Sequence, residues 1–273
     1  MSGIIRVFPR RTNMTPVDDM AFIGFPGLWR PEADEVHVSC TFTWDRDRCE
    51  KLAEAWGAHY PTVKLGGPAY GHPGGPFIPG KYLKKGVVIT SRGCPNKCAH
   101  CYVPKREGDL VEMVRVPTGN IIQDNNLLAC SEEHFSAVMD MLATQCSIEF
   151  PGGLEAARLT DWHVNKLAAI QRHIKQIFLA YDRPAQLGPL RIAAGKLAAA
   201  GFKRDKIRCY VLMGQPGDTV KNAWERVTKA WGAGCLPFAM FYRDDSGKCR
   251  PDPEWRDMVR TCTRPAALKA VLA

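Results

Sequence analysis

The sequence predicts an α/β protein in which a small N-terminal α/β region precedes six strand–helix units. From Val87 to Tyr242, short β-branched runs alternate with longer segments whose apolar residues recur every three to four positions. Gly, Pro, Asn and Asp gather between these segments, where turns are expected. Such alternation favours a parallel sheet wrapped by helices. We expect three parts, at residues 1–85, 86–245 and, as a C-terminal tail, 246–273.

The N-terminal region is expected to contain a strand–helix–strand unit. Residues 36–42 alternate as a strand, and Cys49, Leu52, Ala53 and Trp56 then fall at helical spacing. Residues 62–65 form a second short strand before Gly66-Gly67-Pro68. A unit this compact implies parallel pairing through a right-handed crossover. The Gly- and Pro-rich residues 71–80 are expected to link it to the second region.

The second region is expected to hold six strands, at residues 87–90, 120–124, 147–150, 177–180, 207–213 and 237–242. Ser131 and Thr160 can each cap a helix, and Gly201 can end one. The inward faces of the four main helices are expected to carry Phe135, Val138, Met139 and Leu142; Leu167, Ile170 and Ile174; Leu190, Ala193, Ala194 and Leu197; and Val220, Ala223, Trp224, Val227 and Trp231. One short helix is expected in the tail, near residues 255–261.

Composition indicates an ordinary globular protein of the reducing cytoplasm. Of the 273 residues, 45% are hydrophobic and 24% are charged. We expect no membrane partner, because no apolar run is long enough to span a bilayer and no secretory segment leads the chain. Eleven cysteines without secretion favour a compartment where thiols persist. The net charge of +9 is compatible with a nucleic acid or an anionic substrate.

Three cysteines in one short loop are the strongest chemical signal. Cys94, Cys98 and Cys101 have the spacing C-x3-C-x2-C and follow the first strand of the second region. Gly93 and Pro95 allow the backbone to turn tightly, so that the three thiolates can converge. Iron–sulfur clusters and soft metal ions need convergent thiolates. Three cysteines would leave one iron of a four-iron cluster open to an outside ligand.

This motif resembles the signature of the radical S-adenosylmethionine (radical SAM) superfamily. The resemblance implies a partial (βα)6 barrel, although the alternation alone fits a flat doubly wound sheet equally well. It also implies a [4Fe-4S] cluster bound by the three cysteines and S-adenosylmethionine (SAM) bound at the open iron. A one-electron reductant, such as flavodoxin or ferredoxin, would then drive SAM cleavage to a 5′-deoxyadenosyl radical, which takes hydrogen from a substrate that the sequence does not identify.

The resemblance assigns further residues to SAM. Asp124, Asn125 and Asn126 follow the second strand and look like the acidic segment that holds the SAM ammonium in cobalamin-type relatives. Asp182 ends the fourth strand, where relatives place a polar residue near the ribose. The turn Gly214-Gln215-Pro216-Gly217-Asp218-Thr219 looks like a family turn near the adenine. Asp218 or Thr219 would cap the helix after it.

Gly152 and Gly153 follow the third strand and are expected to bring backbone close to whatever fills the barrel. Glu155 and Arg158 come next, either as contacts to substrate or SAM or as an exposed pair at a helix start. The other eight cysteines show no tight clustering, and Cys49, Cys146 and Cys209 fall on predicted core faces. We therefore expect no second cluster, although Cys235, Cys249 and Cys262 could meet in space.

Two alternatives stay open. Structural zinc, with His100 as a fourth ligand, would make the protein a non-catalytic nucleic-acid-binding module. Alternatively, the N-terminal region resembles a shortened form of the flavodoxin-like domain of cobalamin-binding radical SAM enzymes, which would imply a cobalamin-dependent methyltransferase. We expect no tight cobalamin binding, because none of His37, His59 and His72 lies in the Asp-x-His-x-x-Gly motif of such domains.

Overall fold

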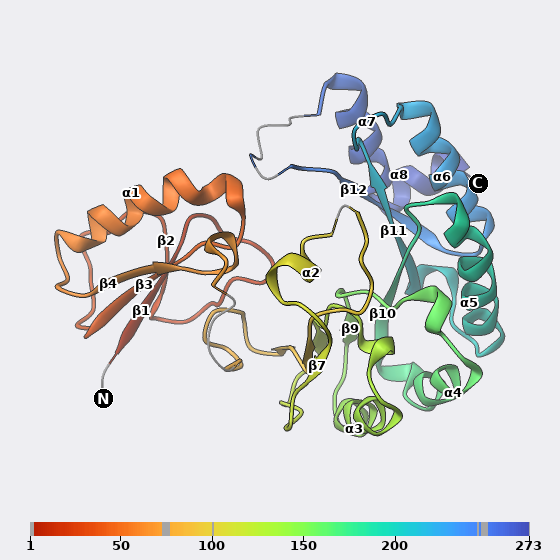
Figure 1. Cartoon of the computed structure of the whole chain (residues 1–273), viewed down its shortest axis with the longest axis horizontal. Helices are drawn as coiled ribbons and strands as arrows, with labels where there is room; N and C mark the ends of the chain where they lie inside the picture. The colour runs from red at the N-terminus through yellow and green to blue at the C-terminus, as the bar shows by residue number, and fades with distance from the viewer. Residues whose placement is uncertain (1–2, 73–76, 100, 245, 247–250, 273) are drawn as a thin grey trace. The chain divides into compact units, whose positions relative to one another are not determined.

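The computed structural model describes residues 3–72, 77–99, 101–244, 246 and 251–272. The chain divides into two compact units, Met1–Val87 with Asp244–Lys248 and Val88–Arg243 with Cys249–Ala273 (Figure 1). The main division therefore falls within two residues of the predicted boundary. Of the predicted tail, Cys249–Ala273 belongs to the second unit rather than forming a separate part. Residues 73–76 of the expected linker lie outside the described residues.

The first unit is built on a parallel four-stranded sheet in the order β2-β1-β3-β4. Its elements are β1 (Ile4–Phe8), β2 (Ala21–Ile23), β3 (Glu35–Ser39), α1 (Arg46–Gly57) and β4 (Val63–Gly66). The predicted strand–helix–strand unit is confirmed, because β3 pairs in parallel with β4 across α1. Strands β1 and β2 were not predicted; Arg6 interrupts the apolar pattern of β1, and β2 has only three residues. Leu52 and Trp56 of α1 are fully buried against this sheet.

The second unit contains a six-stranded sheet in the order β12-β11-β10-β9-β8-β5. Its strands are β5 (Val87–Val88), β8 (Ile121–Ile122), β9 (Ile148–Phe150), β10 (Ile174–Ala180), β11 (Ile207–Met213) and β12 (Leu236–Phe241). Its main helices are α3 (Glu132–Ala143), α4 (Asp161–Ala169), α5 (Leu187–Ala199) and α6 (Val220–Gly232). All six predicted strands are present; β11 has the predicted bounds, β10 begins three residues earlier, and the other four are shifted or shortened by a few residues. The pairings from β8 to β12 are parallel.

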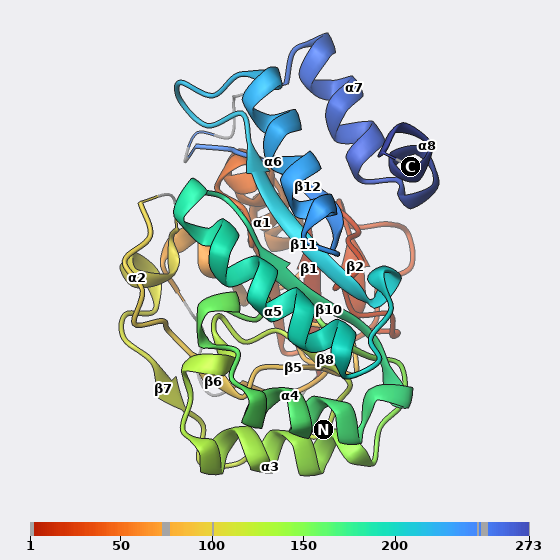
Figure 2. The same ribbon diagram turned by 90° about the vertical axis from the view of Figure 1, so that its right-hand side faces the viewer.

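This sheet is singly wound. Its strands lie in chain order, so no point exists at which the winding reverses. Right-handed crossovers in such a sheet place every helix on the same face. Figures 1 and 2 show α4, α5 and α6 over one face. A flat doubly wound sheet is therefore excluded, and the observed architecture is an open parallel α/β sheet whose edge strands are β5 and β12.

Local capping signals placed three helix starts correctly. The Ser131 hydroxyl accepts a hydrogen bond from His134 N, the Thr160 hydroxyl from His163 N, and the Thr219 hydroxyl from Asn222 N. Gly201 follows α5 with φ of +88°, a left-handed conformation that suits glycine at a helix end. The prediction for Ile174 was wrong, because α4 ends at Ala169 and Ile174 begins β10.

Most differences between the predicted and the observed secondary structure involve short elements. A four-residue helix, α2 (Val103–Arg106), and a two-residue ladder between β6 (Ser91–Arg92) and β7 (Val111–Glu112) were not predicted. The predicted C-terminal helix is present as α7 (Pro253–Cys262), and a second one, α8 (Pro265–Leu272), follows it. Among the described residues, none of the helices has both the length and the apolar character needed to cross a membrane.

Candidate functional site

The cysteine loop lies at the carboxyl end of the sheet's first strand. After β5, the chain forms β6 and then turns at Gly93, whose φ is +76°. A Cβ atom at Gly93 would lie 2.0 Å from the Asp109 carbonyl oxygen, so no other residue fits there without moving the backbone. Cys94 N donates to Gly108 O at 3.2 Å and fixes the start of the loop. The predicted requirement for glycine before the first cysteine therefore has a steric cause.

The three cysteines are neighbours in this loop. Cys94 and Cys101 are partly buried and Cys98 is exposed. Partial desolvation, followed by the nearby Cys101 and Cys94 thiols, raises the pKa of Cys98, while the charge of Arg183 opposes the rise. Within the described part of the chain, no three His, Cys, Asp or Glu side chains are arranged to hold a metal ion. The three thiols are thus not a ready-made site, and His100 lies outside the described residues.

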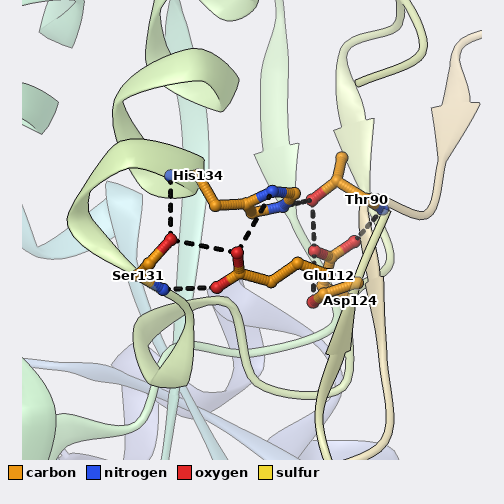
Figure 3. Close-up of polar contacts among 6 residues, drawn as sticks. Thr90, Glu112, Asp124, Ser131 and His134 are labelled. Atoms are coloured by element: carbon orange, nitrogen blue, oxygen red, sulfur yellow. Dashed lines mark hydrogen bonds and ion pairs between the residues drawn. The ribbon is translucent and has the colours of Figure 1, made fainter. Parts of the chain in front are cut away.

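Asp124 lies beneath the loop rather than facing a ligand. Its side chain is 1% exposed, and its Oδ1 accepts from Thr90 N at 2.6 Å. Its Oδ2 accepts from the hydroxyls of Thr90 and, at 2.8 Å, Ser91 (Figure 3). Burial raises the pKa of Asp124, and these hydrogen bonds oppose the rise. The carboxylate therefore holds the segment that leads into Cys94, which corrects the expectation that Asp124 contacts SAM directly.

A histidine extends this network to helix α3. His134 Nε2 lies 3.1 Å from Thr90 Oγ1, and its Nδ1 lies 4.0 Å from Glu112 Oε2 (Figure 3). Glu112 in turn accepts from Ser131 N and, at 3.0 Å, from the Ser131 hydroxyl. Sequence reasoning found Ser131 only as a cap and missed Thr90, Glu112 and His134. Their side chains carried no local signal, because each partner lies 19 or more residues away.

The glycines after β9 approach protein rather than a ligand. A Cβ atom at Gly152 would lie 2.1 Å from the Asp124 carbonyl oxygen. Gly152 N donates to Ile122 O at 3.3 Å, so this turn packs against the end of β8. Gly152 therefore closely approaches the backbone of Asp124, and an approach to whatever fills the barrel stays a prediction.

Asn126 connects Cys94 to the acidic residue after β9. Its Nδ2 lies 3.6 Å from Cys94 Sγ and donates to Glu155 Oε2 at 2.7 Å. Arg158 Nε donates to the same Glu155 oxygen at 2.7 Å. Asn126 is 4% exposed, yet its Oδ1 is buried without a hydrogen-bond partner. The site thus holds an unused acceptor next to a cysteine of the loop.

Asn125 belongs to a second contact, centred on Glu107. Its Nδ2 donates to Glu107 Oε2 at 2.8 Å, and Gly93 N donates to that oxygen at 3.4 Å. Arg92 Nη1 lies 4.0 Å from it as well. Glu107 ties the far end of the cysteine loop back to its beginning. Nothing in its local sequence identified it beforehand.

Asp182 joins two strands at the carboxyl edge of the sheet. Its Oδ1 accepts from Leu212 N at 2.8 Å, and its own N donates to Gln186 Oε1 at 2.8 Å. The structure places it at the predicted edge, with one oxygen engaged by β11. A contact from Asp182 to a ribose stays a prediction.

The turn after β11 is held by a buried ion pair. Asp218 accepts from Gly214 N at 2.9 Å and from Arg226 Nη2 at 2.6 Å. Gly214 has φ of +74°, and a Cβ atom there would lie 2.4 Å from the Phe241 ring. Thr219 caps α6, so Asp218 closes the turn instead. Gln215 is partly exposed and Pro216 is exposed, and their predicted contact with adenine stays a prediction.

Two pairs of buried cysteines are joined by thiol contacts, one pair in each unit. Hydrogen bonding to Cys235, together with burial, raises the pKa of Cys209 well above its usual range. A similar contact joins Cys40 and Cys49. Cys49 and Cys209 are buried, as predicted, whereas Cys146 is exposed. Cys249 lies outside the described residues.

Comparison with known proteins does not assign the chain. No protein-family model matches it. A search of curated proteins finds no significant match either.

The donor chemistry of the site nevertheless fits the group that the motif implies. Thiol sulfurs from one loop suit iron–sulfur ligation. The unpartnered Asn126 Oδ1 suits a hydrogen-bond donor brought by a ligand, such as an ammonium group. Glu155 adds a negative charge and is linked to Cys94 through the side-chain amide of Asn126. The residue types present therefore match the chemistry of a cationic, amine-bearing molecule and a thiolate-bound metal, although the described thiols are not arranged to hold a metal ion.

Proposed function

We propose that this protein is a radical SAM enzyme whose second unit acts as a partial (βα)6 barrel. The observation that carries the proposal is the contact between Cys94 Sγ and Asn126 Nδ2, at 3.6 Å, with the buried Asn126 Oδ1 left free. It joins the three-cysteine loop after the first strand to the polar segment after the second. Working groups of singly wound parallel sheets gather at these carboxyl ends.

Cys94, Cys98 and Cys101 would hold a [4Fe-4S] cluster, and we expect the loop to adjust around it, because metal sites commonly form together with their ligand. Reductive cleavage of SAM to methionine and a 5′-deoxyadenosyl radical is the chemistry that the cluster and SAM would supply. The protein's own contribution is orientation. Asn126 Oδ1 accepts from the amino group of SAM, while Glu155 holds the Asn126 amide and adds charge complementarity.

Asp124 acts through its neighbours. By accepting from Thr90 and Ser91, it fixes the strand end from which the cysteine loop departs. Its role is therefore to position Cys94 and, through its backbone, Asn126. Asp182 and the turn from Gly214 to Pro216 complete the carboxyl edge, where the remaining parts of SAM would lie.

Anaerobic reconstitution with iron and sulfide, followed by incubation with SAM and dithionite, tests the proposal. We expect 5′-deoxyadenosine by mass spectrometry. Cys98→Ala should lose the bound iron, sulfide and visible absorbance, because it removes a loop thiol. Cys146→Ala is the matched control, since Cys146 is also exposed but lies outside the loop. A Cys98→Ala protein that keeps its full iron content would refute the ligand assignment.

Metal and product analysis of the same reconstituted protein distinguishes the radical SAM enzyme from the two alternatives. Stoichiometric zinc without iron or sulfide would favour the nucleic-acid-binding module. Formation of a methylated product that requires added cobalamin would favour the methyltransferase.

A further inference from the structure

The sheet of the second unit carries a buried arginine among aromatic rings on the face away from its helices. Along β11, alternate residues from Ile207 to Met213 are fully buried, whereas Tyr210 and Leu212 on the other face are partly exposed. Arg208 shares the face of Tyr210. Parallel pairing places Phe178 of β10 beside Arg208 and Phe238 of β12 beside Tyr210. We call Arg208, Phe178, Tyr210 and Phe238 the Arg208 cluster.

The three rings of the Arg208 cluster contact one another. Phe178 and Tyr210 are stacked with centroids 4.5 Å apart, and Phe238 meets Tyr210 edge-on at 5.9 Å. Arg208 Cζ lies 5.3 Å from the Phe238 centroid and 5.9 Å from that of Phe178. The guanidinium therefore lies against apolar rings.

The positive charge of Arg208 has no counter-ion within the described part of the chain. Arg208 is 5% exposed, and its Nε has no hydrogen-bond partner among the described residues. The nearby acids are engaged elsewhere: Glu149 with Lys175 at 2.7 Å, and Asp205 with Lys269 at 2.7 Å. Burial lowers the pKa of the Arg208 guanidinium. A buried charge without a partner is costly, and such charges in proteins are normally paired.

Arg204 provides a comparison, because its guanidinium contacts an aromatic ring and also donates hydrogen bonds within the protein. Its Cζ lies 4.1 Å from the Trp231 centroid, and its Nη1 also donates to the Trp231 carbonyl at 2.5 Å and to the Cys235 carbonyl at 3.3 Å. The rings around Arg208 attract the cation but accept no hydrogen bond in the plane of its N–H groups. A planar fork of donors in an apolar setting matches a carboxylate or a phosphate.

We propose that the Arg208 cluster binds the carboxylate or phosphate group of a small anionic substrate. Tyr210 and Phe238 then receive the adjoining apolar or ring-bearing part of the same molecule. Assignment of this anion to the substrate rests on the proposed function, whereas anion binding by Arg208 does not.

Hydrogen–deuterium exchange of the full-length reconstituted protein tests the proposal with three probes: inorganic phosphate, benzoate and neutral benzamide. An anion at ten times its dissociation constant should slow exchange through local opening about eleven-fold in peptides from β10 to β12. Benzamide should have no such effect. Slower exchange with phosphate alone, with benzoate alone or with both supports the proposal and identifies which anion is bound.

Arg208→Met should abolish this protection, and its melting temperature without added anion should equal or exceed that of the unmodified protein. Arg204→Met is the matched control; it should lower the melting temperature and keep the protection. Arg208→Lys, which keeps the charge but not the fork, should respond more weakly than the unmodified protein.

Absence of protection by both anions in the unmodified protein would overturn the proposal. Equal protection by benzamide, or full protection in Arg208→Lys and Arg208→Met, would overturn it too. The SAM cleavage assay on the unmodified protein reports separately on the proposed function: anion binding without 5′-deoxyadenosine would leave the anion site standing and reject the radical chemistry.

Discussion

Asp124 lies at the position expected for a ligand contact, but its carboxylate accepts hydrogen bonds from neighbouring residues of the protein. Acidic residues after a parallel strand are candidates for ligand contact, but here three donors from Thr90 and Ser91 occupy the carboxylate. The network continues through Thr90 to His134. Asp124 therefore determines the position of a loop, whereas Asn126 Oδ1 is a buried acceptor without a partner among the described residues.

Replacing Asp124 by Ala should lower the free energy of unfolding by about 3 kcal/mol, because buried donors lose their acceptor. Asp124→Asn should cost about 1 kcal/mol, since one oxygen remains. Burial raises the pKa of Asp124 in the folded state, so its ionisation costs stability as pH rises above about 4. The penalty of Asp124→Asn should therefore shrink between pH 4 and pH 7 in urea denaturation. A penalty that grows over this range would contradict the assignment.

The reactivity of the Cys130 thiol tests whether burial raises its pKa. It is partly exposed, and burial raises its pKa to about 11. At pH 8 its thiolate fraction is about 10²-fold below that of an ordinary cysteine, and the thiolate is the reactive form. We expect iodoacetamide at pH 8 to label exposed Cys146 long before Cys130, with the Cys130 rate rising toward pH 11. Peptide mass spectrometry measures both sites; equal rates at pH 8 would contradict this expectation.

Helix α4 begins with a cap that depends on a neutral histidine. The Thr160 hydroxyl accepts from His163 N, and His163 Nδ1 lies 2.8 Å from that hydroxyl and 3.3 Å from Thr160 N. Burial lowers the pKa of His163. Protonation of Nδ1 removes the acceptor of the capping box. The cap is therefore expected to hold in neutral solution and to weaken in acid.

Because the folded-state pKa of His163 lies below its unfolded value of about 6.5, this stability is present above that pH and is lost as pH falls below it. His163→Gln keeps a suitable capping side chain without titrating. Its melting temperature should fall less than that of the unmodified protein between pH 7 and pH 5. Thermal unfolding by circular dichroism at both pH values measures the difference, and parallel declines would show that His163 does not contribute.

The described residues of the first unit bear on the expectation that this protein does not bind cobalamin tightly. Its described residues form four strands and one α-helix, which covers at most one face of the sheet. Both ring nitrogens of His37 are engaged, Nδ1 with the Tyr82 hydroxyl and Nε2 with Glu35 at 2.7 Å. This histidine is therefore not free to bind cobalt.

We expect hydroxocobalamin added during reconstitution to be removed by desalting. Absorbance spectra and cobalt content before and after desalting measure retention, with the apo-protein as the control for non-specific binding. Near-stoichiometric cobalt after desalting would overturn this prediction and revive the methyltransferase alternative.

The sequence by itself determined the features whose causes are local. Helix caps at Ser131, Thr160 and Thr219 depend on residues three positions apart, and the strand at Ile207–Met213 follows from a run that is apolar except at Arg208. The cysteine loop and its Gly93 turn were likewise visible in twelve consecutive residues. Hydrophobic periodicity also gave the α/β class, because it reports which face of each element is buried.

Only the tertiary structure decided which side chains meet. Periodicity places a residue on a face but does not select its partner, so the contacts of Asn126 with Cys94 and Glu155, 32 and 29 residues away, were invisible. The burial of Asp124 and the surroundings of Arg208, whose charge has no counter-ion among the described residues, likewise depend on neighbouring strands. Strand order decided between singly and doubly wound sheets, because the same alternation of strands and helices fits both until the pairing is known.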